Sequence, residues 1–283
     1  MPATLYLVST PIGNLEDITF RAVRVLRDEV SLIACEDTRQ TRKLLDHYAI
    51  HKPLVSYHEH NEASRAEELV AKLLAGESIA LVSDAGTPLV SDPGFRLVKA
   101  AIEAGVPVTP LTGPSAALGA LVASGLPCDM FRFIGFLPSR QTARRTTLAA
   151  LAAEHVTVIA YESPHRVLDS LADIEEILGE RLMVLVRELT KIHEEFIRGT
   201  PQSILETLRT RPAVKGEITL VIGPAQPEPE RGLDPAAEVH RLQREEGMEK
   251  MAAIKAVAKR LSLPKREVYR LAERSTKESN PES

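Results

Sequence analysis

The sequence is poor in the residues that stabilise small secreted proteins or span membranes. Of its 283 residues two are cysteines, Cys35 and Cys128, and none is tryptophan. Two isolated cysteines provide neither a disulfide framework nor a metal-ligand cluster, which fits a reducing compartment. No apolar run approaches the roughly 18 residues that a membrane helix needs, and residues 1–9 do not resemble a signal peptide. We therefore expect a cytoplasmic protein outside the membrane.

Two phosphate-binding signatures are also missing. The sequence has no G-x-x-x-x-G-K-[ST] segment, and its first glycine-containing loop lacks the G-x-G-x-x-G pattern of dinucleotide-binding proteins. These absences argue against an ATPase and against a nicotinamide-dependent dehydrogenase.

The overall charge excludes a strong attraction of the whole chain to nucleic acid, because 35 basic residues face 39 acidic ones. That balance conceals a division. Residues 250–277 carry nine Lys or Arg and two Glu, a net charge of +7, whereas residues 1–249 carry −9. An acidic body with a basic tail predicts an anionic partner that is contacted mainly by the tail.

Four loops of glycine, proline and small polar residues each follow a short apolar run typical of a buried strand. In an open α/β sheet, ligands bind at the carboxyl ends of the strands, where such loops gather. Glycine and proline let the backbone approach a ligand and hold a fixed turn. The loops suit a ligand with an adenosine, a zwitterion and a positive sulfur better than a polyphosphate. The four loops are STPIGN (9–14), SDAGTP (83–88), GPSA (113–116) and ESPHR (162–166).

Strands and helices alternate over residues 1–114, which predicts βαβ units and a parallel sheet. The expected strands cover 4–9, 32–35, 54–57, 79–83 and 106–111, and the expected helices 21–27, 38–47, 63–74 and 95–104. A helix at 115–123 leads to residues 115–224, where strands predominate and we expect a mixed sheet. Its strands are expected at 131–136, 156–161, 182–187, 194–198 and 217–222, with helices near 142–153, 167–177 and 203–208.

Prolines mark a stiff linker over residues 225–235, and residues 236–283 read as a helical tail domain. One apolar helix face is followed by a break at Pro264 and a second short face, the outline of a helix-turn-helix. The first face comprises Met251, Ile254, Val257, Ala258 and Leu261, and the second begins with Val268 and Leu271. A helical hairpin used only for packing remains the alternative.

Seven segments in order resemble one family. They are TPIGNLEDIT (10–19), EDTR (36–39), SDAGTP with SDPG (83–94), GPSA (113–116), GFLP (135–138), YESPHR (161–166) and TK (190–191). Together they resemble the ribosomal RNA small-subunit methyltransferase I family, a branch of the tetrapyrrole-methylase superfamily. The resemblance implies two α/β domains of tetrapyrrole-methylase type, the first with a parallel sheet and the second with a mixed one, plus a small helix-turn-helix-like C-terminal domain.

The resemblance also implies S-adenosylmethionine as methyl donor, bound in a cleft between the two α/β domains. It further implies a homodimer. The implied reaction is 2′-O-methylation of a cytidine ribose in 16S rRNA of the small ribosomal subunit. Where related methylases have Gly-Gly-Asp-Pro, this chain has AGTP at 85–88, and we expect Asp84 to replace the missing carboxylate. The implied donor-binding residues are Ile12, Asp84, Ala85, Gly86, Thr87, Val90, Ser115, Ala116 and Glu162.

A ribose hydroxyl needs a base to take its proton. Superfamily relatives place an acid–base carboxylate where Glu36 and Asp37 follow a predicted strand. Either could be the catalytic residue, and either could instead cap the next helix. We favour Glu36 as the base and Asp37 as the cap.

Basic side chains provide candidate RNA contacts. Arg140, Arg144 and Arg145 precede a helix, where a phosphate contact and a solvated helix start are equally good interpretations. The forked donors of Arg166 suit a phosphate, whereas His165 is more simply structural. His58 and His60 alternate on an extended segment but have no third ligand, so we expect no metal site. The tail candidates are Lys255, Lys259, Lys265, Arg266 and Arg270.

Two other functions are compatible with part of these observations. A methyltransferase for a small tetrapyrrole-type precursor would use the same loops but would have no use for the basic tail. A protein that binds RNA without catalysis would have no use for the loops.

Overall fold

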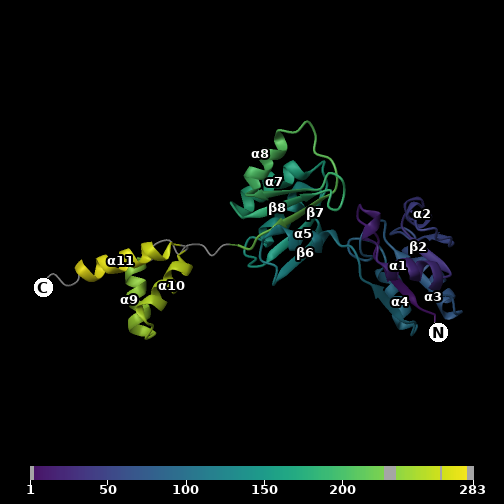
Figure 1. Ribbon diagram of the computed structural model, residues 1–283, viewed down its shortest axis with the longest axis horizontal. Coiled ribbons are helices and arrows are strands. Elements are labelled where there is room, and N and C mark those ends of the chain that lie inside the picture. Colours follow the sequence, from purple (N-terminus) through teal and green to yellow (C-terminus); the bar gives the residue numbers. More distant parts are fainter. Residues whose placement is uncertain (1–2, 226–233, 262, 279–283) are drawn as a thin grey trace. The chain divides into compact units, whose positions relative to one another are not determined.

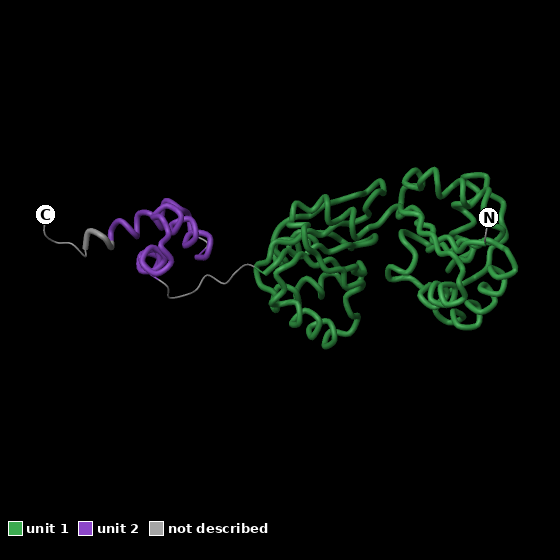
Figure 2. Tube along the Cα trace, turned by 90° about the horizontal axis from the view of Figure 1, so that it is seen from below, with its two compact units in different colours: residues 1–225 green, residues 226–283 purple. Residues whose placement is uncertain are grey.

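The structure is a computed structural model that describes residues 3–225, 234–261 and 263–278 (Figure 1). The chain forms two compact units, Met1–Ala225 and Gln226–Ser283 (Figure 2). The expected linker at 225–235 falls largely outside the described residues. None of the helices in the described part of the chain has the length and apolar character needed to cross a membrane.

The first sheet is entirely parallel, as predicted. Its strands are β1 (Leu5–Val8), β2 (Leu32–Cys35), β3 (Leu54–Ser56), β4 (Ile79–Val82) and β5 (Val108–Leu111), in the order β3-β2-β4-β1-β5. Leu5 is in register with Ile79 on one side and with Val108 on the other. Apolar side chains point to both faces of β2 and β4, because helices cover both faces of a parallel sheet.

Four helical segments connect these strands: η1 with α1 (Leu15–Asp17, Phe20–Arg24), α2 (Thr38–His47), α3 (Glu62–Leu74) and α4 (Phe95–Glu103). The segment 21–27 was expected to be one α-helix, but only its first part is α-helical. α1 continues into a π-helical turn, η2 (Val25–Glu29). In that turn the Val30 amide donates to the Val25 carbonyl at 3.3 Å. The wider turn lets Val25, Leu26 and Val30 all reach one core cluster.

The second sheet is mixed, also as predicted. Its strands are β6 (Phe131–Phe136), β7 (Thr157–Glu162), β8 (Met183–Arg187), β9 (Glu195–Gly199) and β10 (Ile218–Ile222), in the order β6-β7-β10-β8-β9. β6 and β7 are parallel, and the other neighbouring pairs are antiparallel. The last strand in sequence, β10, therefore lies at the centre.

Helices cover both faces of this sheet (Figure 1). On one face α6 (Gln141–Ala150), α7 (Val167–Leu178) and α8 (Pro201–Arg209) pack over side chains such as Leu185 and Leu220. On the other, α5 (Ala116–Ser124) packs over Val184 and Val221. Successive strand residues point to opposite faces, so one strand serves both cores.

The C-terminal unit contains three helices in its described part, α9 (Pro235–Glu245), α10 (Lys250–Arg260) and α11 (Lys265–Glu278). Val239 and Leu242 of α9 pack with Ile254 and Val257 of α10 and Val268 of α11. The helix break at Pro264 is as expected. The prediction that Met251 belongs to the first apolar face was wrong: Met251 is 54% exposed and lies outside this core cluster.

Candidate functional site

A cavity of about 370 Å³ lies within the first unit, between loops of the two sheets. Loops after β1 and β4 form one wall, and the ends of β6, β7 and β10 form the other. The first residue of α5 closes it. The cavity is lined by Ile12, Ala85, Val90, Ser91, Asp92, Ala116, Phe136, Tyr161, Glu162, Ser163, Pro164, Glu217, Ile218 and Thr219.

Hydrogen bonds join the loops after β1 and β4. The backbone amides of Thr10 and Gly86 each donate to the other's carbonyl, at 2.9 and 3.0 Å. The Thr10 hydroxyl donates to the Ser83 carbonyl at 3.0 Å, and the Ser83 hydroxyl donates to the Gly86 carbonyl at 2.9 Å. The buried hydroxyls of Thr10 and Ser83 are thus satisfied within this wall, so it needs no ligand to complete its hydrogen bonds.

The turn that follows is strained. Leu89 and Ser91 have φ angles of 69° and 67°, which are costly for side chains with a Cβ. Gly94 has φ 144°, and a Cβ there would lie 2.8 Å from the Leu81 side chain. The turn reaches β6, because the Ser91 hydroxyl lies 3.4 Å from where a Cβ of Gly135 would stand. The turn therefore packs closely against β6, and its residues Ser91 and Asp92 line the cavity.

Aromatic rings form part of the opposite wall. The rings of Phe136 and Tyr161 meet edge-on with centroids 5.4 Å apart, and Phe133 packs on Tyr161 at 5.0 Å. Burial raises the pKa of Tyr161 above its usual value, so its hydroxyl stays neutral. The wall therefore offers apolar surface for a flat ring.

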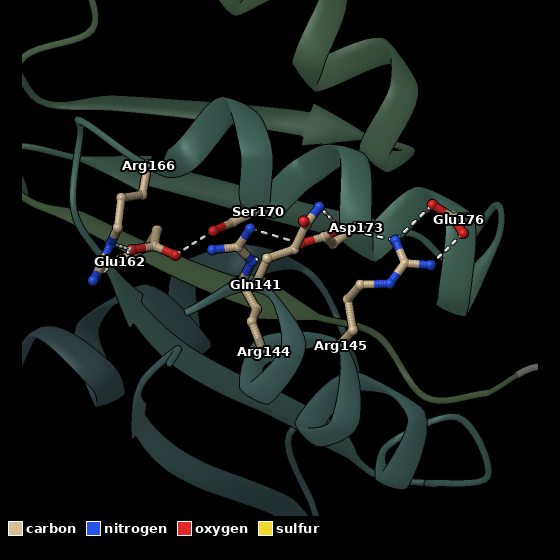
Figure 3. Close-up of polar contacts among 8 residues, drawn as sticks. All are labelled: Gln141, Arg144, Arg145, Glu162, Arg166, Ser170, Asp173 and Glu176. Carbon is tan, nitrogen blue, oxygen red and sulfur yellow. Dashed lines mark hydrogen bonds and ion pairs between the residues drawn. The ribbon is translucent and has the colours of Figure 1, made fainter. Parts of the chain in front are cut away.

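Glu162 contributes a carboxylate that is already fully engaged (Figure 3). Its side chain has 0% exposure and accepts hydrogen bonds from the Ser163 amide at 2.6 Å and from Arg166 at 2.8 Å. The Ser170 hydroxyl donates to its second oxygen. Glu162 thereby positions the turn at 163–166, and Arg166 is held at that turn by the same contact.

A second polar network joins α6 to α7 and accounts for two of the arginines (Figure 3). Arg144 is 4% exposed and donates to Asp173 at 2.7 and 2.8 Å. Arg145 contacts Asp173 at 3.0 Å and also pairs with Glu176. Burial opposes ionisation of Asp173, but these hydrogen bonds lower its pKa below the usual value. Arg144 is therefore buried rather than available to an RNA phosphate, whereas Arg140 is exposed.

A more polar pocket of about 520 Å³ lies beside β2. It is lined by Glu36, Asp37, Thr38, Arg39, Ser56, His58, His60 and Asp84. Asp37 is the N-cap of α2, as predicted, and accepts from the Arg39 amide at 2.8 Å. Hydrogen bonds from Arg39 lower the pKa of Asp37 to about 2, so it is a poor base.

Two other carboxylates of this pocket, Glu36 and Asp84, do not cap a helix as Asp37 does. Asp84 accepts from the Asp37 amide at 3.0 Å. Burial, and then the charge of Asp84, raise the pKa of Glu36. In the described residues no group of three or more His, Cys, Asp and Glu side chains could hold a metal ion, and the rings of His58 and His60 are 6.0 Å apart.

The expected donor-binding residues divide between several places. Five of them line the 370 Å³ cavity: Ile12, Ala85, Val90, Ala116 and Glu162. Asp84 lines the polar pocket instead. Gly86 and Thr87 do not line the cavity but hold its loops together: Gly86 pairs with the Thr10 backbone, and the Thr87 hydroxyl donates to the Pro114 carbonyl. Ser115 caps α5 by accepting from the Leu118 amide.

Sequence reasoning missed three prominent lining residues, Asp92, Phe136 and Tyr161. Each belongs to a segment that carries the family resemblance, so a signal was present. Burial, followed by the charges of Glu36 and Asp84, raises the pKa of Asp92 to about 6.

The candidate RNA contacts of the tail lie on the surface of α10 and α11. All five are exposed: Lys255, Lys259, Lys265, Arg266 and Arg270. Other basic residues of the unit are used internally. Arg260 contacts Glu238 at 2.6 Å, and Lys250 pairs with Glu273.

Comparison with known proteins gives a consistent result. The sequence matches the family described as Tetrapyrrole (Corrin/Porphyrin) Methylases over residues 4–205. The protein named ribosomal RNA small subunit methyltransferase I of Halalkalibacterium halodurans is 48% identical over 275 residues, 95% of this chain and 94% of the relative. The protein of the same name from Escherichia coli O157:H7 is 50% identical over 256 residues, 89% of each chain.

Solved structures agree on the fold. A uroporphyrin-III-C-methyltransferase from Thermus thermophilus matches 78% of this chain and 94% of its own with a TM-score of 0.55 and 22% identity. A structure of such an enzyme complexed with S-adenyl homocysteine matches 78% of this chain and 97% of its own, with a TM-score of 0.54 and 18% identity. With its two sheets, its cavity and these relatives, the chain belongs to the ribosomal RNA small subunit methyltransferase I family of the tetrapyrrole methylases.

Proposed function

We propose that this protein transfers a methyl group from S-adenosylmethionine to the 2′-hydroxyl of a cytidine ribose in 16S rRNA of the small ribosomal subunit. The names of the curated relatives supply the acceptor RNA. The observation that carries the chemistry is the 370 Å³ cavity between the two sheets.

The residues around this cavity fit the donor. Its volume is within the range of small-molecule sites, about 300–1,000 Å³. Ile12, Phe136 and Tyr161 offer apolar surface for the adenine ring. The bound donor supplies a methyl group that its sulfonium has already activated.

The protein has two remaining tasks. The hydrogen-bonded wall at Thr10 and Gly86 and the turn at 163–166 would hold donor and acceptor in line, which lowers the entropic part of the barrier. A base must also take the proton of the acceptor hydroxyl.

The exposed basic residues of α10 and α11 supply a surface for RNA phosphates. We expect replacement of both Lys265 and Arg266 by alanine to weaken RNA binding across sequences. The slope of log K against log salt should fall by roughly one for each phosphate that the variant no longer neutralises. Filter binding with small-subunit RNA at several salt concentrations measures this slope.

The matched control for this experiment is the Arg209→Ala/Lys215→Ala double variant, which removes two exposed positive charges from the first unit. Its salt slope should remain that of the unaltered protein. Equal slopes in both double variants and the unaltered protein would assign the tail to packing.

We further infer a homodimer that works in the cytoplasm, where small subunits are made. The support for a second copy is a set of exposed apolar residues in the first unit: Leu118 and Val122, one turn apart on α5, are 50% and 75% exposed, and Met130 is 70% exposed. Light scattering of the purified protein gives its mass, and a monomer at micromolar concentration would refute the dimer.

The reaction itself is tested with methyl-labelled S-adenosylmethionine and 30S subunits. The expected result is label in 16S rRNA that is recovered on the ribose of a cytidine after digestion to nucleosides. Label on a base or on protein only would refute the proposal. Transfer to a tetrapyrrole, unaffected by removal of residues 236–283, would support the alternative of a small-molecule methyltransferase. Absence of donor binding in calorimetry would indicate an RNA-binding protein without catalysis.

A further inference from the structure

The carboxylates that line the donor cavity are not equivalent. Glu162 is saturated by Arg166, Ser163 and Ser170. Glu217 is paired with Lys191 at 3.2 Å. Asp92 is the third, and among the described residues no ion pair to Asp92 occurs. It is thus the cavity carboxylate that has no basic partner among the described residues.

Asp92 also lies where the two pockets approach each other. It lines the donor cavity, and it is close enough to Glu36 and Asp84, which line the polar pocket, for their charges to act on it. From the second sheet, Tyr161 faces it closely enough to sense its charge. A nucleoside that enters through the polar pocket would present its ribose to the donor beside Asp92.

The backbone holds Asp92 in this place. It is flanked by Ser91 in a left-handed conformation and by Pro93, and Gly94 closes the turn with φ 144°. Strain of this kind persists only where the surrounding structure enforces it, and it is concentrated at functional sites.

We propose that Asp92 is the general base of the methyl transfer, an inference that rests on the proposed function. Its carboxylate accepts the proton as the O–H bond of the ribose breaks. The ribose oxygen forms a bond to the methyl carbon, and the carbon–sulfur bond breaks with its electron pair moving to sulfur, which leaves a neutral thioether. Asp92 then loses its proton to water when the products leave.

The electrostatics of the turn support this role. Burial and the charges of Glu36 and Asp84 raise the pKa of Asp92 to about 6. A base is more effective when its pKa is near the working pH. The carboxylate form, and with it activity, is present above pH 6 and is lost as the pH falls through this value. Glu36 is then a residue that tunes Asp92, not the base itself.

Asp92→Asn is the first test. We expect kcat on 30S subunits at pH 8 to fall at least ~100-fold, with the calorimetric Kd for S-adenosylmethionine changed less than about tenfold. The cavity control is Glu217→Gln, which removes another carboxylate from the same wall and should retain an activity limb near pH 6. Loss of donor binding in Asp92→Asn, or an unchanged pH profile, would overturn the proposal.

Glu36→Gln is the second test, and it does not depend on the stability of the Asp92 variant. If Asp92 is the base, removal of the Glu36 charge shifts the acid limb of activity to lower pH. If Glu36 is the base, the limb disappears with the activity, and the proposal is overturned.

A carbon-13 NMR titration of the carboxyl groups gives the same comparison without any turnover. One aspartate carboxyl resonance should titrate near pH 6. This resonance should be absent in Asp92→Asn and should titrate at a lower pH in Glu36→Gln. The absence of such a resonance would overturn the assignment. Since the titration needs neither donor nor RNA, its result is separate from the test of the proposed function, which the labelling of 30S subunits decides.

Discussion

Replacement of Ala116 by phenylalanine is expected to lower the affinity for S-adenosylmethionine at least ~100-fold, or about 2.7 kcal/mol. Ala116 begins α5 and lines the 370 Å³ cavity. A benzyl group there would occupy space that the donor needs, whereas the first turn of the helix tolerates the larger side chain because the position is only half-buried. Calorimetry measures the affinity directly.

The same substitution at Ala123, an exposed residue near the end of α5, is the matched control. It should leave the donor affinity within about twofold, and both variants should unfold near the same urea concentration. Undiminished donor binding in Ala116→Phe would place the donor somewhere other than this cavity.

Replacement of Arg144 by alanine is expected to destabilise the first unit by about 3–5 kcal/mol, because it leaves a buried carboxylate without its main partner. Asp173 is 3% exposed, and Arg144 supplies both contacts to its Oδ2. Gln141 and Arg145 contact only the other oxygen, Oδ1. Urea denaturation followed by circular dichroism gives the free energy of unfolding.

Arg140→Ala tests whether loss of any arginine at this helix start has the same effect. Arg140 is exposed, so its removal should change stability by less than about 0.5 kcal/mol. The effect of Arg144 should also depend on pH. Because the folded-state pKa of Asp173 is lowered, its contribution is present above the unfolded pKa of about 3.9 and is lost as the pH falls below that value. A similar loss in both variants would contradict the importance of the buried pair.

The alternation of strands and helices was enough to predict two sheets and their types. It could not give the order of the strands. β1 lies between β4 and β5, and β10 lies between β7 and β8, arrangements set by packing among residues far apart in the sequence. The π-helical turn at Val25–Glu29 likewise depends on which side chains the sheet can accept.

The candidate site could be predicted only in part, because some of its residues are also placed by packing between distant segments. The loops after strands pointed to Ile12, Ala85 and Ala116, and all three line the cavity; that they bind the donor stays a prediction. Phe136 and Tyr161 stand at strand ends, where an apolar side chain looks like core in the sequence. Arg144 was misleading because Asp173, which buries it, is 29 residues away along the chain. Long-range pairs of this kind leave no local pattern.

The central position of β10 has a consequence for folding during synthesis on the ribosome. A chain emerging from the ribosome folds from its N-terminal end, but β7 and β8 have no shared neighbour until residues 218–222 have been made. Glu217, Ile218 and Thr219, which complete the cavity wall, arrive in the same segment. The capacity to hold a methyl donor is therefore acquired late in synthesis, and a chain released before residue 222 lacks the middle of its second sheet.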